Sequence, residues 1–194
     1  MKNTRFFTLI EVLAVMAIIA ILGLIGFGSY SYATNAAKTA RSEALLKNFE
    51  AGLVSFYSQR GYYPQSAAGG EFNAVTMTLG ADNTVGTVDF GGTVLEDSDT
   101  DPIKKELFNS FAKAVDLEQF RQNRDNTGRL TDAWGGVIYY RAPGVFKTGS
   151  FDLISAGPDG KFSSDNADTP VGITDVSKYR DADGGHLCDD LFNF

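Results

Sequence analysis

The sequence has one cysteine, Cys188, and one histidine, His186, in 194 residues. A single cysteine excludes an intramolecular disulfide. Two such ligands do not make a zinc site, so neither a disulfide scaffold nor a structural zinc domain is expected. No trio of nucleophile, base and orienting residue can be assembled from the sequence, and we therefore do not expect an enzyme.

Basic residues are also scarce. The chain has 17 Lys and Arg against 24 Asp and Glu, which gives a formal net charge of -7. Lys2 and Arg5 precede the first hydrophobic run, so the rest of the chain is more acidic still. No basic cluster offsets this charge, and we expect no nucleic-acid partner. The acidic surface fits solvation, cation binding, or both.

One long stretch lacks charge altogether. No residue between Glu11 and Lys38 is charged, and residues 12–28 contain no polar side chain. A run of this length can cross a bilayer as a helix. The positive charges before it hold that end in the cytoplasm, so we predict a transmembrane helix over residues 7–28 and an exported domain over residues 29–194.

Two simpler interpretations of this run are less suitable. A secretory signal peptide has a shorter apolar region without an acid inside it. A plain membrane anchor explains the length of the run but leaves Glu11 unexplained. A carboxylate at the centre of a membrane helix costs about 2.5–3.5 kcal/mol, so such a group usually has a partner and a function.

Beyond residue 28 the apolar residues change to a helical stripe. They recur at steps of three and four residues, with most charged residues off the stripe. The stripe consists of Leu45, Leu46, Phe49, Leu53, Phe56 and Tyr57. Gly61 is a suitable C-cap and Pro64 a stop. We predict one helix over residues 7–60, whose amphipathic half, residues 29–60, packs on the rest of the domain.

The middle of the chain, residues 65–130, predicts loops with one strand and one helix. Residues 75–79 alternate like a strand, and residues 102–120 have a helical period. The buried side of that helix is expected to contain Ile103, Leu107, Phe108, Phe111, Val115 and Phe120. The acidic loop before it has Pro102 where a calcium loop needs Gly, so we interpret it as a solvated turn.

The last third, residues 131–194, predicts a hairpin followed by an acidic tail. Residues 137–141 and 150–155 are rich in β-branched and aromatic residues and are expected to pair. From Asp159 to Asp190 there are eight Asp and no Glu. Calcium takes six to eight oxygens from flexible loops, which this segment can supply. Asp that only forms turns and solubilises the loop is the alternative, and both stay open.

The N-terminus resembles a known family. The segment from Phe7 to Val12, Phe-Thr-Leu-Ile-Glu-Val, followed by the apolar run, is similar to the prepilin cleavage and methylation motif of type IV pilins and type II secretion pseudopilins. The resemblance implies that a prepilin peptidase cuts between Phe6 and Phe7 and methylates the new amine. It implies that Glu11 faces the N-terminal amine of a neighbouring subunit during assembly. The family usually has Gly where this chain has Phe6.

The C-terminal third resembles the major pseudopilin. Its Asp-Pro-Trp-Gly segment is matched by Asp132, Trp134 and Gly135, with Ala in place of Pro. Its Ser-x-Gly-x-Asp-Gly segment is matched over residues 155–160. In that family the following loop binds calcium. The resemblance assigns the ligands to the Ala156 carbonyl, Asp159 and Asp168, with Asp165 a close rival of Asp168.

Together these features predict an α+β, pilin-like fold with a long N-terminal helix packed on a small antiparallel sheet and a loop-rich C-terminal region. Residues 1–6 would be a leader peptide. The resemblance implies a single-pass inner-membrane protein with a periplasmic domain, assembled into a homo-oligomeric filament with other pseudopilins and an inner-membrane platform to support secretion. A type IV pilin or minor pilin for adhesion, motility or DNA uptake is the alternative.

Overall fold

The computed structural model describes most of the chain. The described residues are 8–67, 71–98, 100–163, 165, 167–170, 172–180 and 190–194, with the side chains of residues 23–29 left aside. The chain divides into two compact units, Met1–Lys38 and Thr39–Phe194. The first contains the N-terminal part of one long helix, and the second contains the rest of that helix and every described strand.

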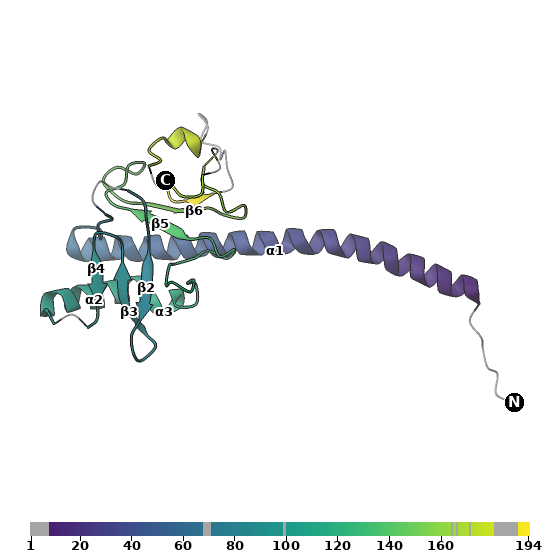
Figure 1. Ribbon diagram of the computed structural model, residues 1–194, viewed down its shortest axis with the longest axis horizontal. Helices are drawn as coiled ribbons and strands as arrows, with labels where there is room; N and C mark the ends of the chain where they lie inside the picture. The colour runs from purple at the N-terminus through teal and green to yellow at the C-terminus, as the bar shows by residue number, and fades with distance from the viewer. Residues whose placement is uncertain are drawn as a thin grey trace. The chain divides into compact units, whose positions relative to one another are not determined.

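The elements follow one another in the order shown in Figure 1. The helices are α1 (Leu9–Arg60), α2 (Pro102–Val115), α3 (Leu117–Phe120) and the short 3-10 helix η1 (Val176–Lys178). The strands are β1 (Asn73–Ala74), β2 (Thr76–Leu79), β3 (Val85–Asp89), β4 (Val94–Glu96), β5 (Ile138–Arg141), β6 (Asp152–Ser155) and β7 (Leu191–Phe192). The prediction of an α+β fold with a long N-terminal helix and small antiparallel sheets is confirmed, and it is consistent with a pilin-like fold.

Helix α1 ends where the sequence predicted. Gly61 has a φ of 76°, a left-handed conformation that glycine adopts without steric cost. Its amide donates a hydrogen bond of 2.7 Å to the carbonyl oxygen of Tyr57. Pro64 lies beyond the last turn and does not continue the helix.

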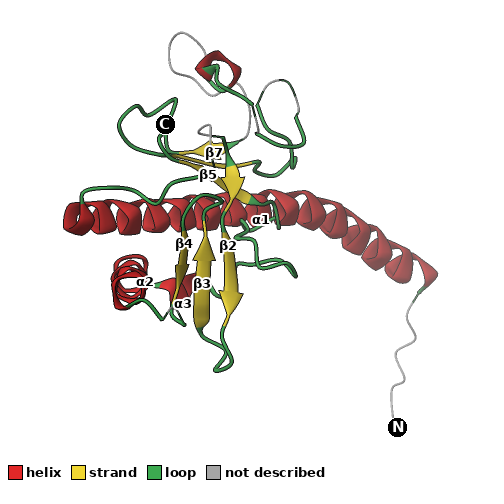
Figure 2. Ribbon diagram, turned by 60° about the vertical axis from the view of Figure 1, so that its left-hand side comes forward, coloured by secondary structure: helices red, strands yellow, loops and turns green. Residues whose placement is uncertain are grey.

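Two antiparallel sheets form the β structure of the second unit. One has the order β1-β5-β6-β7 and the other the order β2-β3-β4. The predicted hairpin is confirmed, because Ile138 pairs with Ser155 and Arg141 with Asp152. In the views of Figures 1 and 2 the β2–β4 sheet lies below the C-terminal part of α1, and β5 and β6 lie above it.

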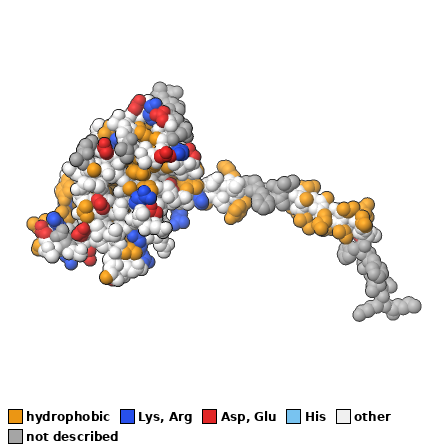
Figure 3. All heavy atoms as spheres, in the orientation of Figure 1, with side chains coloured by type: hydrophobic (Ala, Val, Ile, Leu, Met, Phe, Trp, Pro, Cys, Tyr) orange, Lys and Arg blue, Asp and Glu red, His pale blue; other side chains and the backbone are white. Residues whose placement is uncertain are grey.

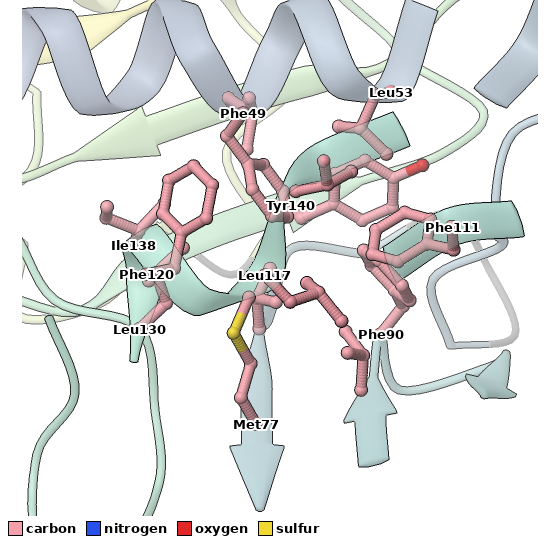
Figure 4. Close-up of a cluster of buried hydrophobic side chains, with 14 of the residues drawn as sticks. Phe49, Leu53, Met77, Phe90, Phe111, Leu117, Phe120, Leu130, Ile138 and Tyr140 are labelled. Atoms are coloured by element: carbon pink, nitrogen blue, oxygen red, sulfur yellow. The ribbon is translucent and has the colours of Figure 1, made fainter. Parts of the chain in front are cut away.

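The main core forms around the predicted stripe of α1. Phe49 and Leu53 are fully buried, and Figure 4 shows both pointing from α1 into a cluster with side chains of α2, α3 and the strands. The ring of Phe49 meets the rings of Phe111 and Phe120 edge to face, with centroids 6.5 and 5.4 Å apart. Tyr57 was predicted in the stripe but is 42% exposed, so that assignment is wrong at the last turn.

The predicted helix over residues 102–120 is in fact two helices. Asp116 has φ 50° and ψ 65°, a left-handed conformation that ends α2 and precedes α3. Ile103 was predicted on the buried side but is 70% exposed, because the first turn of α2 extends past the core. The predicted burial is confirmed for Phe108, Phe111, Val115 and Phe120.

A second, smaller apolar cluster holds the C-terminal region. Its buried members are Phe72, Ile154, Ala156, Phe162 and Tyr179. Aromatic side chains from the chain end pack on it, and the rings of Phe146 and Phe194 have centroids 4.3 Å apart. The last residues of the chain are therefore part of the packed domain.

Candidate functional site

The N-terminal part of α1 presents apolar side chains to solvent on all sides. Every residue of the helix from Leu9 to Leu22 is exposed, and ten large hydrophobic side chains have exposed fractions between 49% and 78%. In Figure 3 hydrophobic side chains cover the visible face of this stretch. A helix that is apolar all round is normally buried in a membrane or an assembly.

A search of the described residues found no helix long and apolar enough to cross a membrane. The predicted transmembrane segment, residues 7–28, is therefore not confirmed.

The start of α1 is fixed by Thr8 and Glu11. The Thr8 backbone N–H and hydroxyl both donate to Glu11 Oε2 at 2.8 Å, and the Glu11 N–H is 3.4 Å from Thr8 Oγ1. This is a capping box, in which two residues satisfy each other's backbone groups at a helix N-terminus. The sequence analysis missed Thr8, although Thr-x-x-Glu before an apolar run is the signal for it. The predicted cleavage residues, Phe6 and Phe7, lie outside the described residues.

Glu11 borders an apolar groove on the helix surface. Val12, Val15, Met16 and Ile19 form the rest of the lining. If this surface becomes buried, the carboxylate must be buried with a partner, because an isolated charge in an apolar environment is strongly unfavourable. The Thr8 donors satisfy one oxygen of Glu11 within the chain. A cation from outside the chain would have to complete the site.

The two motifs of the C-terminal third meet in space. Asp132 is buried, and its Oδ1 accepts hydrogen bonds of 2.8 Å from the Trp134 and Gly136 amides. Its Oδ2 accepts a hydrogen bond of 2.5 Å from the hydroxyl of Ser155. A Cβ added at Gly136 would lie 2.8 Å from Asp132 Oδ2, so this position needs glycine. The sequence analysis identified both motifs but did not predict that a hydrogen bond between Asp132 and Ser155 connects them.

The same loop is attached to α1. The Ala133 amide donates a hydrogen bond of 3.0 Å to Oγ of Ser42, a fully buried residue of α1. The side chain of Arg41, one residue earlier, donates a hydrogen bond of 3.1 Å to Asn123 Oδ1. The loop before β5 therefore holds a fixed position on α1 through polar contacts.

The predicted calcium ligands follow β6. Ala156 is buried at the end of this strand, whereas Asp159, Asp165 and Asp168 are exposed. Asp159 Oδ1 accepts a hydrogen bond of 2.8 Å from the backbone amide of Lys161.

Lysines lie beside the other two acids. The Lys161 ammonium pairs with Asp168, and the Lys178 ammonium lies 3.1 Å from Asp165 Oδ1. The hydrogen bond and the charge of Lys161 lower the pKa of Asp168.

The predicted calcium site uses two acids, Asp159 and either Asp165 or Asp168, which all lie in the part of the chain that the structure describes. No group of three or more His, Cys, Asp or Glu side chains there is placed to hold one ion. Asp165 and Asp168 pair with different lysines. The donor type, oxygen alone, suits calcium. Calcium binding therefore stays a prediction.

The sequence analysis missed one buried acid near this loop. Asp190 is 1% exposed, and its Oδ2 accepts a hydrogen bond of 2.5 Å from the Ser163 amide. It precedes β7, whose Leu191 pairs with Ser155 of β6. No local pattern marks Asp190 for burial, since the amide that it accepts from lies 27 residues earlier in the chain. Residues 181–189, with His186 and Cys188, lie outside the described residues.

A buried ion pair between β5 and β6 was also missed. Arg141 Nη2 lies 2.6 Å from Asp152 Oδ2, and both side chains are at most 2% exposed. Asp152 also accepts from the amides of Val145, Phe146 and Lys147 at 2.9–3.1 Å.

The guanidinium group of Arg141 has further contacts. It lies 4.0 Å from the ring centroid of Phe72 and 4.6 Å from that of Phe146. Its Nη1 donates to the Ile173 carbonyl at 3.0 Å. One arginine thus connects the hairpin to the C-terminal segment.

A comparison with protein families gives one match. The family model described as the prokaryotic N-terminal methylation motif matches residues 1–27. No curated protein and no solved structure matches the chain. The motif implies processing by a prepilin peptidase and assembly into a pilus-like filament. It supports a type IV pilin-like family for this chain.

Proposed function

We propose that this chain is a structural subunit of a type II secretion pseudopilus. One observation carries the proposal. A prepilin-type methylation motif leads directly into a helix whose apolar side chains are exposed from Leu9 to Leu22. After cleavage between Phe6 and Phe7, this helix would pack with those of neighbouring subunits in the filament core. The role is mechanical, and no catalytic step is assigned to it.

Before assembly the subunit resides in the inner membrane as a single-pass protein. Support for this comes from the sequence, since residues 12–28 carry no polar side chain and Lys2 and Arg5 precede them. The domain is then periplasmic. In the assembled filament the positive amine of Phe7 in one subunit can pair with the negative Glu11 of its neighbour. Each charge then offsets the free-energy cost of burying the other.

The C-terminal third supports a secretion subunit over a type IV pilin. The hydrogen bond between Asp132 and Ser155 joins the two segments that resemble the major pseudopilin. The lone Cys188 also cannot form the intramolecular disulfide that many type IV pilins have. A pilin or minor pilin for adhesion, motility or DNA uptake is the competing function.

We also propose that calcium stabilises the C-terminal loop through Asp159, the Ala156 carbonyl, and either Asp165 or Asp168. The concentration of Asp in this segment supports it. Thermal unfolding of the full chain in detergent, with calcium or with a chelator, tests it. Calcium should raise the melting temperature. Asp159→Ala should abolish the rise, and so should one of the two substitutions Asp165→Ala and Asp168→Ala. Equal melting temperatures with calcium and with a chelator would reject this part of the proposal.

Deletion and complementation in the source bacterium test the function. Loss of the gene should abolish secretion of folded periplasmic proteins, and the wild-type gene should restore it while Glu11→Ala should not. Retraction-driven motility, adhesion and DNA uptake are measured in the same strains. If secretion is intact and one of those activities is lost, the pilin function replaces the secretion function.

A further inference from the structure

Two tyrosines directly after the apolar run are among the most exposed large side chains of the described residues. Tyr30 is 72% exposed and Tyr32 is 80% exposed, and both lie within helix α1. In the packed domain, by contrast, Tyr140 and Tyr179 are fully buried. Large aromatic side chains are costly to leave in water, so their exposure calls for an explanation.

Their distance along the helix matches the thickness of a bilayer. The axial rise from Glu11 to Tyr30 is roughly 29 Å at about 1.5 Å per residue. The hydrocarbon core of a typical bilayer is about 30 Å thick. If Glu11 lies at one boundary of the hydrocarbon layer, Tyr30 and Tyr32 lie at the other.

Their positions around the helix distinguish a lipid layer from a single packed protein face. Residues two apart differ by about 200° around an α-helix, so Tyr30 and Tyr32 point to nearly opposite sides. A packed protein face needs a stripe with steps of three and four residues, as in Leu45, Phe49 and Leu53. A layer of lipid headgroups surrounds the helix and contacts both sides at once.

We propose that Tyr30 and Tyr32 anchor the unassembled subunit in the headgroup layer on the periplasmic side of the membrane. Tyrosine suits this boundary, since its ring is apolar and its hydroxyl forms hydrogen bonds. The anchor fixes the depth of α1, which holds Glu11 at the cytoplasmic boundary where the next subunit must meet it. This inference rests on the proposed membrane insertion.

Depth-dependent fluorescence quenching tests the anchor in the full chain. Trp134 is the one native tryptophan, and Trp134→Phe provides the background after its melting temperature has been shown to be unchanged. Single tryptophans are introduced as Ile21→Trp, Tyr30→Trp, Tyr32→Trp and Ala36→Trp. The proteins are reconstituted in phosphatidylethanolamine–phosphatidylglycerol vesicles that contain lipids brominated either near the headgroup or deep in the chain.

The four positions have different expected results. Tryptophan at positions 30 and 32 should be quenched most by the shallow bromine, at position 21 most by the deep bromine, and at position 36 by neither. If position 21 escapes the deep bromine, membrane insertion itself is wrong. A different result rejects the anchor alone. In that case the deep bromine quenches tryptophan at position 21, which supports membrane insertion, but the shallow bromine does not quench tryptophan at positions 30 and 32.

A second measurement tests whether the tyrosines set the depth. In an Ile21→Trp protein that also carries Tyr30→Ala and Tyr32→Ala, the preference for the deep bromine should become weaker, because the apolar run still inserts but the helix no longer has a fixed depth. The conservative pair Tyr30→Phe and Tyr32→Phe should keep most of that preference. An unchanged preference in the alanine variant overturns the proposal.

Discussion

Two stretches of the same helix have opposite surroundings. From Leu9 to Leu22 every residue is exposed, whereas Leu45, Phe49 and Leu53 are at most 7% exposed. The buried stretch has apolar residues at steps of three and four with polar residues between them, and its partner is the same chain. The exposed stretch is apolar without a period. The difference fits the proposed role, in which the exposed stretch packs against other subunits or lies in the membrane.

The largest effect is expected at the one acid of the exposed stretch. Glu11→Ala should abolish filament assembly, because the amine of the neighbouring subunit would be buried without a partner. Electron microscopy and sedimentation of filaments measure assembly. The melting temperature of the domain, followed by Trp134 fluorescence in detergent, should not change.

Glu43→Ala is the matched control for this substitution. Glu43 is an exposed acid of α1 within the packed unit. Its removal should leave both assembly and melting close to wild type. Normal filaments from the Glu11→Ala protein would show that the exposed stretch does not use this carboxylate to assemble.

In the packed unit the largest loss of stability is expected at the buried ion pair. Arg141→Met leaves Asp152 buried with an uncompensated charge, which typically costs about 3–5 kcal/mol. Arg129→Met is the control, since Arg129 pairs with Asp125 while 44% exposed. Pairs of that kind contribute at most about 1 kcal/mol. Chemical denaturation should separate the two variants clearly, and equal losses would contradict the role assigned to burial.

A leucine from each stretch sharpens the comparison further. Leu53→Ala removes a fully buried side chain and should destabilise the domain by about 2–5 kcal/mol. Leu13→Ala removes a side chain that is 60% exposed and should leave the denaturation midpoint unchanged. It should instead weaken membrane retention or assembly. A shift of the domain midpoint by Leu13→Ala would mean that the exposed stretch packs on its own domain.

The smallest effect depends on pH. Burial raises the pKa of Asp125, but hydrogen bonds from Thr127 and Arg129 outweigh burial and hold the pKa well below its usual range. The charged form therefore stabilises the fold above the unfolded pKa of about 3.9, and this contribution is lost as the pH falls toward the lower folded value.

Asp125→Asn removes that contribution. The variant should be less stable than wild type by about 1 kcal/mol at pH 7, and the difference should begin to shrink below about pH 4 and continue to shrink as the pH falls further. A constant difference across the whole pH range would contradict the assignment.

The sequence predicted those features that depend on local pattern. The period of apolar residues located the buried face of α1, and β-branched and aromatic runs located the hairpin of β5 and β6. It did not predict features that depend on distant partners. The break at Asp116 needs a left-handed residue that no local signal marks, and β7 is only a two-residue strand that exists because β6 offers it an edge.

The residues of the candidate site show the same difference between local sequence patterns and contacts from distant segments. The methylation motif is a contiguous pattern and was found from sequence, with Thr8 overlooked inside it. The buried partners of Arg141 and Asp132 come from separate segments, so only the fold reveals them. Asp165 and Asp168 are alternatives for one predicted calcium ligand, and only the fold reveals that each pairs with a different lysine.

The central claim is that the N-terminus is processed for assembly. Intact-mass and N-terminal peptide analysis of the protein recovered from cells with a prepilin peptidase tests it most directly. We expect a chain that begins at Phe7 and carries one additional methyl group, with Phe6→Gly processed at least as efficiently. A chain that keeps Met1–Phe6 in both proteins, or that is cut elsewhere, would contradict the account.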